Sequence, residues 1–249
     1  ERIASLGGHT DESEWVSWAP DGRRLATTSI DARVRIYDFA KRELERSLPG
    51  RNRSVSRVRV APGGQRIAIA GADRSLRVLD ASSAPIAVLE DVHPKAVKGM
   101  EWSPDGQRLA STSLDGGVAV WATPSGAVAP IATRFQRPVG VYAVTWSPDG
   151  SRIYVSNVAD DTVSVIDVSA RTVVATIAVG DGPLTLDVNA SGSQVFVANG
   201  SGGTVSVIDT ATNTVVRTFA AVSLPTDLQL SPDGTRAVVL PRRRRRRAI

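Results

Sequence analysis

The stretch Ser147-Pro148-Asp149-Gly150 is one of six copies of a turn motif that recur at nearly constant spacing. Proline presets the backbone angle at the second turn position, and the final glycine accepts a positive φ. The final glycines are 42, 42, 44, 42 and 42 residues apart. The six copies are Ala19-Pro20-Asp21-Gly22, Ala61-Pro62-Gly63-Gly64, Ser103-Pro104-Asp105-Gly106, Ser147-Pro148-Asp149-Gly150, Asn189-Ala190-Ser191-Gly192 and Ser231-Pro232-Asp233-Gly234. Such a period indicates a repeat architecture running from end to end.

Between the turns, apolar residues alternate with period two and β-branched residues dominate, which predicts strands rather than helices. The first repeat reads as four short strands, a to d, at 15–18, 24–29, 34–38 and 44–48. Strand a recurs at 55–60, 97–102, 141–146, 183–188 and 225–230, and strand c at 76–80, 118–121, 162–167 and 204–209. A lone four-stranded unit leaves both faces apolar, and stacking such units around an axis buries them. We therefore expect an all-β propeller of about six four-stranded blades.

The two ends predict how this ring closes. Ile3-Ala4-Ser5-Leu6 stands where strand d of a preceding blade would lie, and residues 225–240 supply strands a and b of a sixth blade. Its strand c would fall at Arg246 to Ile249, degraded or cut short. We expect residues 1–241 to form a single β-propeller domain, closed by pairing of N- and C-terminal strands, with 242–249 as an Arg-rich tail. The alternative is a fragment of a seven- or eight-bladed propeller.

The composition narrows the partners. The net charge of the chain is +5, and Arg242 to Arg247 alone supply six positive charges. The rest of the chain therefore sums to −1 and is nearly neutral. A nucleic-acid-binding body should carry a basic face of its own, so we expect no specific nucleic-acid partner and a solvated tail. The lack of cysteine excludes disulfides, thiolate catalysis and cysteine-ligated zinc. No apolar run is long enough to span a membrane. We expect a monomeric domain and favour the cytoplasm over a secreted or periplasmic location.

The first and third repeats share a polar pattern with fixed spacing. His9 precedes the first strand a, Asp31 follows strand b, and Tyr37 ends strand c; His93, Asp115 and Trp121 are their counterparts. The histidine-to-aspartate spacing is 22 residues and the histidine-to-aromatic spacing is 28 residues in both repeats. This pattern resembles WD-repeat proteins. The resemblance implies two hydrogen-bonded tetrads that lock their blades, namely His9, Ser29, Asp31 and Tyr37, and His93, Ser113, Asp115 and Trp121. The second repeat has Arg51 and Leu79 instead and cannot build one.

The fourth and fifth repeats look different. Tyr154-Val155-Ser156-Asn157 and Phe196-Val197-Ala198-Asn199 are each followed by Thr-Val-Ser-Val-Ile-Asp, at 162–167 and 204–209. This resembles the YVTN-type repeats of surface-layer and redox-associated propellers. Both families build the same blade but do not share one function, so the mixture identifies no particular partner.

The sequence contains no motif typical of catalysis. Phosphate-binding glycine loops, the His-Glu-x-x-His zinc signature and the Gly-x-Ser-x-Gly nucleophile elbow are all missing. With both histidines expected in tetrads, we predict no catalytic residue, cofactor or metal. Strand a lines the central channel of a propeller, and Arg59, Glu101 and Asp187 are its charged positions there. They would hold a small cation or polar ligand, or else form a solvated tunnel with an ion pair; the second interpretation is favoured.

The remaining candidate surface is the entrance face, where strand a begins and where WD-repeat proteins commonly dock peptides. The partner-binding candidates there are Trp15, Arg57, Lys98, Tyr142 and Asp227. Exposed aromatic residues and arginine concentrate interface energy, although Trp15 and Tyr142 could instead pack between blades. We therefore expect a non-catalytic scaffold that binds a peptide or partner domain. The alternatives are a propeller enzyme or enzyme subunit, lactonase-like or electron-transfer-associated, and an extracellular surface-layer protein.

Overall fold

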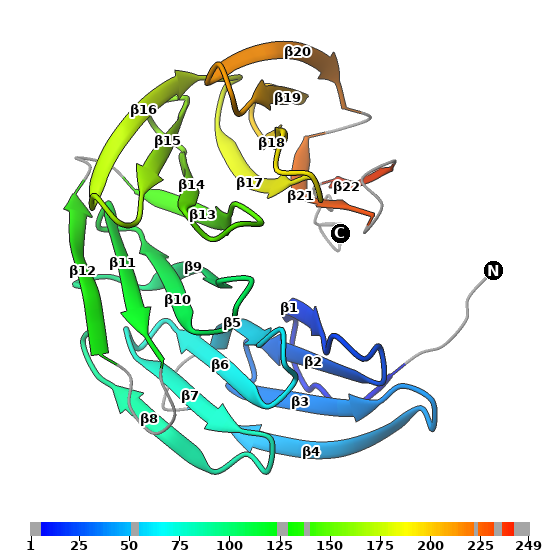
Figure 1. Ribbon diagram of the computed structural model, residues 1–249. Helices are drawn as coiled ribbons and strands as arrows, with labels where there is room; N and C mark the ends of the chain where they lie inside the picture. Colours follow the sequence, from blue (N-terminus) through cyan, green and yellow to red (C-terminus); the bar gives the residue numbers. More distant parts are fainter. Residues whose placement is uncertain are drawn as a thin grey trace. The chain divides into compact units, whose positions relative to one another are not determined.

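The computed structural model describes residues 6–50, 55–123, 129–136, 140–221, 224–231 and 236–241, with the backbone alone at 129–136 and 241. Every regular element in these ranges is a β-strand (Figure 1). Among these residues no helix exists that could cross a membrane. The chain divides into two compact units, Glu1–Pro138 and Val139–Ile249.

The first unit contains three four-stranded antiparallel sheets, each with its strands in chain order. Successive strands pair because short turns join them, as expected for meanders. Sheet 1 consists of β1 (Ser13–Trp18), β2 (Arg24–Ser29), β3 (Arg33–Asp38) and β4 (Glu43–Pro49); sheet 2 of β5 (Val55–Val60), β6 (Arg66–Gly71), β7 (Leu76–Asp80) and β8 (Pro85–Leu89); sheet 3 of β9 (Val97–Trp102), β10 (Arg108–Ser113), β11 (Gly117–Ala122) and β12 (Ala129–Gln136).

The second unit repeats this plan. Sheets 4 and 5 are four-stranded, and the sixth repeat contributes two described strands. Sheet 4 consists of β13 (Val141–Trp146), β14 (Arg152–Asn157), β15 (Thr162–Asp167) and β16 (Thr172–Ala178); sheet 5 of β17 (Pro183–Val188), β18 (Gln194–Asn199), β19 (Thr204–Asp209) and β20 (Thr214–Ala220); sheet 6 of β21 (Pro225–Leu230) and β22 (Ala237–Pro241).

The repeated turn motif forms the first connection of each of the first five sheets. In the copy that ends at Gly150, the glycine amide donates to the Ser147 carbonyl at 2.8 Å, and the glycine has φ 68°. The other described copies close in the same way, with glycine φ between 66° and 73°. The glycine is required because this left-handed conformation is unfavourable for a residue with a Cβ. The sixth copy, at 231–234, lies partly outside the described residues.

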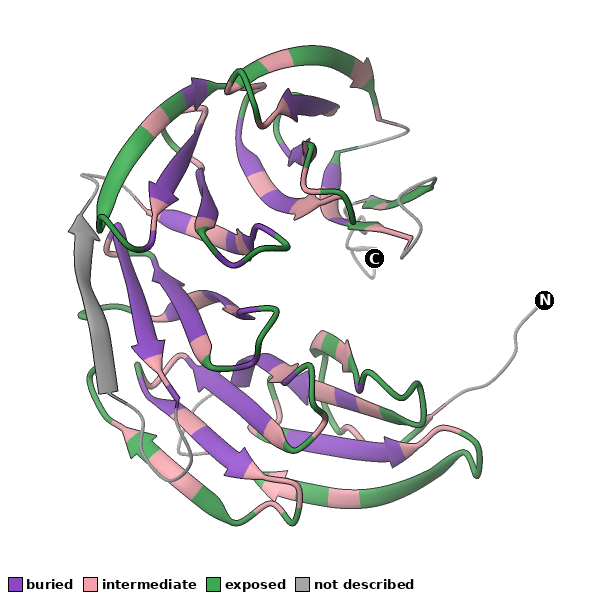
Figure 2. Cartoon of the chain, viewed as in Figure 1, coloured by how far each residue is buried: buried purple, intermediate pink, exposed green. Residues whose placement is uncertain are grey.

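Neighbouring sheets share cores within each unit. One cluster joins sheets 1 and 2 through residues such as Ile36 and Val58, and another joins sheets 2 and 3 around Met100 and Trp102. In the second unit, one cluster joins sheets 4 and 5 and a smaller one joins sheets 5 and 6. The third strand of each four-stranded sheet is largely buried, whereas fourth strands such as β4 and β16 are mostly exposed (Figure 2). Stacking therefore buries the apolar sheet faces, as the sequence predicts.

The expected all-β class, the four-strand repeat and the predicted positions of strands a and c are confirmed. In the described part of the chain no sheet is closed, and six blades and ring closure stay predictions. Most of the proposed closing strand at Ile3–Leu6 lies outside the described residues, and so do Arg51 and the tail at 242–249. That residues 1–241 form a single domain also stays a prediction.

Candidate functional site

An aromatic ring in contact with two arginines marks the start of β1 and β5. Both strands have a register irregularity here, between Ser13 and Trp15 and between Val55 and Arg57. Such bulges re-aim the side chains that follow them. The Cζ of Arg57 lies 4.0 Å from the ring centroid of Trp15, and the Cζ of Arg59 lies 4.7 Å from it. A guanidinium group over an indole is attracted by about 0.5–2 kcal/mol.

Glu101 on β9 extends this group to sheet 3, and we call Trp15, Arg57, Arg59 and Glu101 the Trp15 cluster. Arg59 Nε donates to Glu101 Oε2 at 2.6 Å, with the two side chains 20% and 31% exposed. Because water screens this pair, it contributes about 0–1 kcal/mol, but it fixes the direction of the guanidinium group. The indole N–H of Trp15 is buried and makes no hydrogen bond within the described residues. Trp15 can therefore offer a partner ring carbon atoms rather than a donor.

The five residues predicted to bind a partner are divided between the units. Trp15 and Arg57 contact each other, but Arg57 is buried, and Trp15 also packs against the core shared by sheets 1 and 2. Lys98 is half-buried on β9 of the same unit. Tyr142 and Asp227 belong to the second unit; Asp227 Oδ1 accepts the Leu228 amide at 2.9 Å. The structure thus brings together the first two residues of the predicted set.

The three residues predicted to line a channel make contacts between neighbouring sheets. Arg59 and Glu101 form the ion pair that one interpretation of the sequence anticipated. Asp187 Oδ2 accepts the Leu230 amide at 2.8 Å and so links β17 to β21. Ser17 links β1 to β5 in the same way, accepting the Val60 amide at 3.3 Å. These side chains connect adjacent strands within each unit, and the channel itself stays a prediction.

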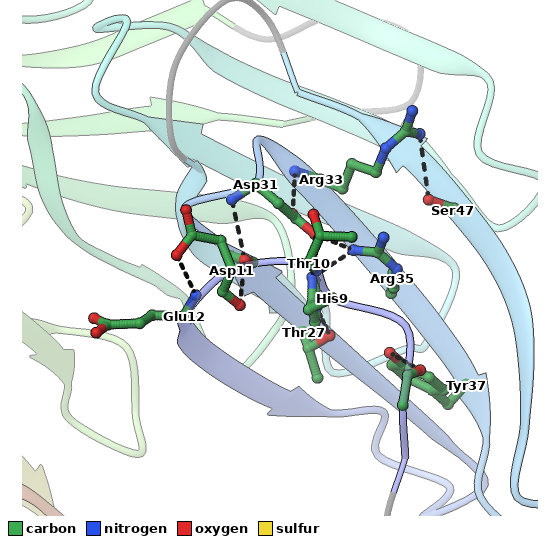
Figure 3. A network of polar contacts seen from close by, with 12 residues as sticks. His9, Thr10, Asp11, Glu12, Thr27, Asp31, Arg33, Arg35, Tyr37 and Ser47 are labelled. Carbon is green, nitrogen blue, oxygen red and sulfur yellow. Dashed lines mark hydrogen bonds and ion pairs between the residues drawn. The ribbon is translucent and has the colours of Figure 1, made fainter.

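His9 is the centre of a polar network in sheet 1 (Figure 3). Its Nδ1 lies 3.1 Å from Asp31 Oδ2, and its Nε2 lies 2.6 Å from Thr27 Oγ1. Arg35 Nη1 donates to Asp31 Oδ2 at 2.7 Å and also contacts the His9 ring. Burial raises the pKa of Asp31, but hydrogen bonds from the Thr10 amide, Arg35 and His9 outweigh it and hold this pKa well below 3.8. The carboxylate is therefore ionised and well held.

His93 is the centre of a different network in sheet 3. It is fully buried, and its Nε2 lies 2.9 Å from Ser111 Oγ. Trp121 Nε1 donates to the same hydroxyl at 2.9 Å. The His93 Nδ1 lies 3.6 Å from Asp115 Oδ1. An indole, a hydroxyl and an imidazole thus form a continuous chain of polar contacts inside the sheet.

The structure corrects three of the eight predicted tetrad positions. The hydroxyls in contact with the imidazoles are those of Thr27 and Ser111, not Ser29 and Ser113. Residues two apart in a strand share a face, so the period allowed either choice. Ser29 and Ser113 instead lie at the end of strand b, next to the b–c turn. Each donates to a backbone carbonyl in the loop before strand a, that of Asp11 and that of Lys95 respectively.

The third correction concerns Tyr37, which has the position of Trp121 in the repeat. Its hydroxyl donates to the Gly7 carbonyl at 3.1 Å, whereas Trp121 donates to the tetrad hydroxyl. Arg35 joins the network instead, and sequence reasoning missed it. The available signal was an arginine between Val34 and Ile36, in a strand whose counterpart in sheet 3 has Ala119.

Sequence reasoning also missed the role of two asparagines in the YVTN-type repeats. Asn157 Nδ2 donates to Thr162 Oγ1 and Ser164 Oγ, both at 2.9 Å. Asn199 repeats these contacts in sheet 5 with the hydroxyls of Thr204 and Ser206. The asparagines have the repeat position of Ser29 and Ser113, so sheets 4 and 5 are locked by an amide in place of an imidazole. The identical sequences that follow the two asparagines, at 162–167 and 204–209, could have predicted this shared role.

The described residues contain no group of three or more His, Asp or Glu side chains that could hold a metal ion. Both histidines contact hydroxyls and carboxylates of their own sheets. Each imidazole thus lies between a hydroxyl and a carboxylate, and in sheet 3 both His93 and Ser111 are fully buried, as expected for a structural lock.

Comparison with known families finds two types of propeller repeat along the chain. A family model described as YNCE-like beta-propeller matches residues 116–246, and one described as WD domain, G-beta repeat matches residues 1–38, 42–80 and 84–122. Since the first covers more than half of the chain, the protein belongs to the YNCE-like β-propeller family, and its N-terminal part consists of WD40 repeats. No curated protein matches the chain. WD40 and β-propeller domains are commonly protein-interaction scaffolds, whereas YNCE-like propellers include enzyme-related members.

Proposed function

We propose that this protein is a non-catalytic scaffold that binds a peptide of a partner protein over the Trp15 cluster. The observation that carries the proposal is the contact of Trp15 with both Arg57 and Arg59, where two neighbouring strands begin. Aromatic residues and arginines held in fixed positions are the usual anchors of protein interfaces. The sheets keep these anchors rigid, so little conformational entropy is lost when a peptide binds.

The chemistry of the cluster favours an acidic peptide with an apolar side chain. Two guanidinium groups and one carboxylate give the cluster a net positive charge, and Trp15 presents ring carbon. A peptide carboxylate that reaches Arg59 competes with Glu101, which now holds that guanidinium group. Loss of the Glu101 charge should therefore strengthen binding of an acidic peptide.

A displayed library of random peptides, selected on the whole chain, tests this proposal. We expect enrichment of acidic peptides with an aliphatic or aromatic residue, at least tenfold weaker binding to Trp15→Ala, and tighter binding to Glu101→Gln. Trp18→Ala is the matched control, because Trp18 is 46% exposed on the same strand but packs against Phe39. A chain without residues 242–249 should bind equally well. Selected peptides that bind Trp15→Ala as tightly as the native chain would refute the proposal.

We also propose that the six repeats form one ring, with the N-terminal segment completing the last sheet. The constant period supports this, as does the open face of β1: Val16 is 51% exposed, whereas its counterparts Val58 and Met100 are buried. Deletion of residues 1–6 should then speed amide hydrogen exchange in β21 and β22. Unchanged exchange there would favour the alternative of a longer propeller.

A further inference from the structure

The seam between sheets 1 and 2 contains a small hollow of about 20 Å³, open to solvent, beside the turns that follow β1, β5 and β7. Its walls are small or aliphatic, and its rim carries two arginines and a glutamate. The lining residues are Ala19, Arg24, Ala26, Ile36, Glu45, Arg46, Val60, Gly64, Ile67 and Ala81. All of them lie in the first unit, and none belongs to the Trp15 cluster, although Val60 directly follows Arg59 on β5.

One repeat further along the chain, the same seam is filled. Trp102 is buried between sheets 2 and 3, and its Nε1 donates to the Arg59 carbonyl at 3.2 Å. Arg66 lies over the indole, with its Cζ 5.2 Å from the ring centroid. It also donates to the carbonyls of Gly106 and Thr123 in sheet 3. An aromatic ring thus fills this seam and an arginine covers it.

The two seams have matching walls. Ala61, Ala68, Val78 and Leu109 surround Trp102 in the core of sheets 2 and 3, and the period of 42 residues relates them to Ala19, Ala26, Ile36 and Ile67 in the hollow. The large difference is at one position, where Val60 replaces Trp102. A valine occupies much less volume than an indole. The hollow therefore lies where a ring fills the seam one repeat later, and the rim side chains Arg24 and Arg46 have to move aside for a ring to enter it.

The rims of the two seams differ. Arg24 is the counterpart of Arg66, but its Nε donates to Glu45 Oε2 at 2.8 Å and its side chain is 46% exposed. Arg46 donates to the carbonyl of Ala81, which is the counterpart of Thr123, at 2.8 Å. With no ring beneath it, Arg24 points to a surface carboxylate instead of covering the seam. An exposed ion pair of this kind is weak, so Arg24 can be recruited by a ring.

We propose that this hollow is a second docking site, which receives one aromatic side chain of a partner protein with Arg24 stacked over it. The internal counterpart argues for this occupant: similar small and aliphatic walls already hold a tryptophan side chain presented by a neighbouring strand, under an arginine. An aromatic ring gains about 0.5–2 kcal/mol from such a cation, beyond the burial of its apolar surface. This site shares no residue with the Trp15 cluster.

Ligand-observed NMR with the blocked tripeptide acetyl-Ala-Trp-Ala-amide and the whole chain tests the proposal. We expect saturable binding, at least tenfold weaker binding to Val60→Trp, and about threefold weaker binding to Arg24→Ala. Val88→Trp is the matched control, because Val88 is 42% exposed on β8 and a tryptophan there leaves the hollow unchanged. If Val60→Trp does not fold, Ala19→Leu narrows the same hollow and should weaken binding in the same direction.

Each result has a definite meaning. Equal binding of the acetyl-Ala-Leu-Ala-amide peptide, or no saturable binding of the tryptophan peptide, overturns the proposal. Free indole that binds where the tripeptide does not would make the hollow a small-molecule site and also overturn it. Trp15→Ala should leave the tripeptide affinity unchanged; weaker binding to that variant would assign the peptide to the Trp15 cluster, which refutes this second site and leaves the proposed function standing.

Discussion

Sheets 1 and 3 have the same histidine, aspartate and aromatic spacing, and they build two different networks from it. In sheet 3, Trp121 and His93 meet at the hydroxyl of Ser111 in a dry interior. In sheet 1, the network contains an ion pair between Arg35 and Asp31. Ala119 has the position of Arg35, and this substitution, together with the change from tryptophan to tyrosine, separates a lock without an arginine from one that contains an Arg–Asp ion pair.

The contrast shows that spacing fixes where the polar groups are, while the side chains of the third strand decide which groups bond. The sheet 3 network is built on an indole, a hydroxyl and an imidazole, whereas the sheet 1 network contains two charges whose side chains are both more than 90% buried. A buried ion pair adds little net stability, yet removing one partner is costly because it leaves the other charge unpaired. The following experiments use this asymmetry.

The largest effect is expected from Arg35→Ala, which gives sheet 1 the residue that sheet 3 has. Asp31 would keep its contacts with Thr10 and His9 but lose its cationic partner. We expect a loss of about 3 kcal/mol in the free energy of unfolding. Urea unfolding followed by tryptophan fluorescence suits this measurement, because four of the five tryptophans lie in the first unit.

The matched control for Arg35→Ala is Arg33→Ala, two residues earlier on β3. Arg33 is exposed and donates to Ser47 at the long distance of 3.4 Å, so its loss should cost less than about 0.5 kcal/mol. If Arg35→Ala were as stable as Arg33→Ala, the two sheets would be locked alike and the ionic interpretation of sheet 1 would be wrong.

A smaller loss is expected from His93→Ala in the sheet 3 network. The substitution empties a fully buried site and deprives the Ser111 hydroxyl of one of its two partners. We expect a loss of about 2 kcal/mol, with binding of a selected peptide unchanged below the melting temperature. Thermal melting and peptide titration on the same sample measure both. A selective loss of peptide binding at an unchanged melting temperature would mean that His93 is functional rather than structural.

Acid should separate the two networks further. Because the pKa of Asp31 is lower in the folded state than its ordinary value of 3.8, the folded protein binds fewer protons there than the unfolded chain. The stability from this group is therefore complete above about pH 4 and is lost as pH falls toward the lower pKa of the folded state. The gap in unfolding free energy between the native chain and Arg35→Ala should narrow over this range. A gap that stays constant down to pH 2 would show that Asp31 keeps its charge by other means.

These differences mark the limit of what the sequence could predict. The turns needed glycine at a fixed interval and the strands needed period-two patterns, so their positions were readable to within one or two residues. The hydroxyl that contacts each imidazole could not be predicted from the sequence. Thr27 and Ser29 lie on the same face of β2, and only the packing of sheet 1 decides which hydroxyl faces His9.

The candidate site was predictable to a similar extent. The sequence indicated that strand a begins at one face, which brought Trp15 and Arg57 into a single hypothesis, and their contact followed. It did not indicate that Arg57 would be buried, because burial depends on how the bulge before it turns the side chain. The hollow at Val60 was also missed, although an aligned comparison of positions 60 and 102 contained the signal.

The smallest effect is expected from Tyr37→Phe, which tests whether Tyr37 has any part in the lock of sheet 1. Its hydroxyl donates to the Gly7 carbonyl, so the substitution removes a bond to the loop before β1 and leaves His9, Asp31 and Thr27 in place. We expect a loss of about 1 kcal/mol. In sheet 3, Trp121→Phe removes the donor to Ser111 itself and should cost more. Hydrogen exchange of the Thr27 amide should be unchanged in Tyr37→Phe. Faster exchange there would place Tyr37 in the tetrad after all and make the two sheets more alike than their contacts indicate.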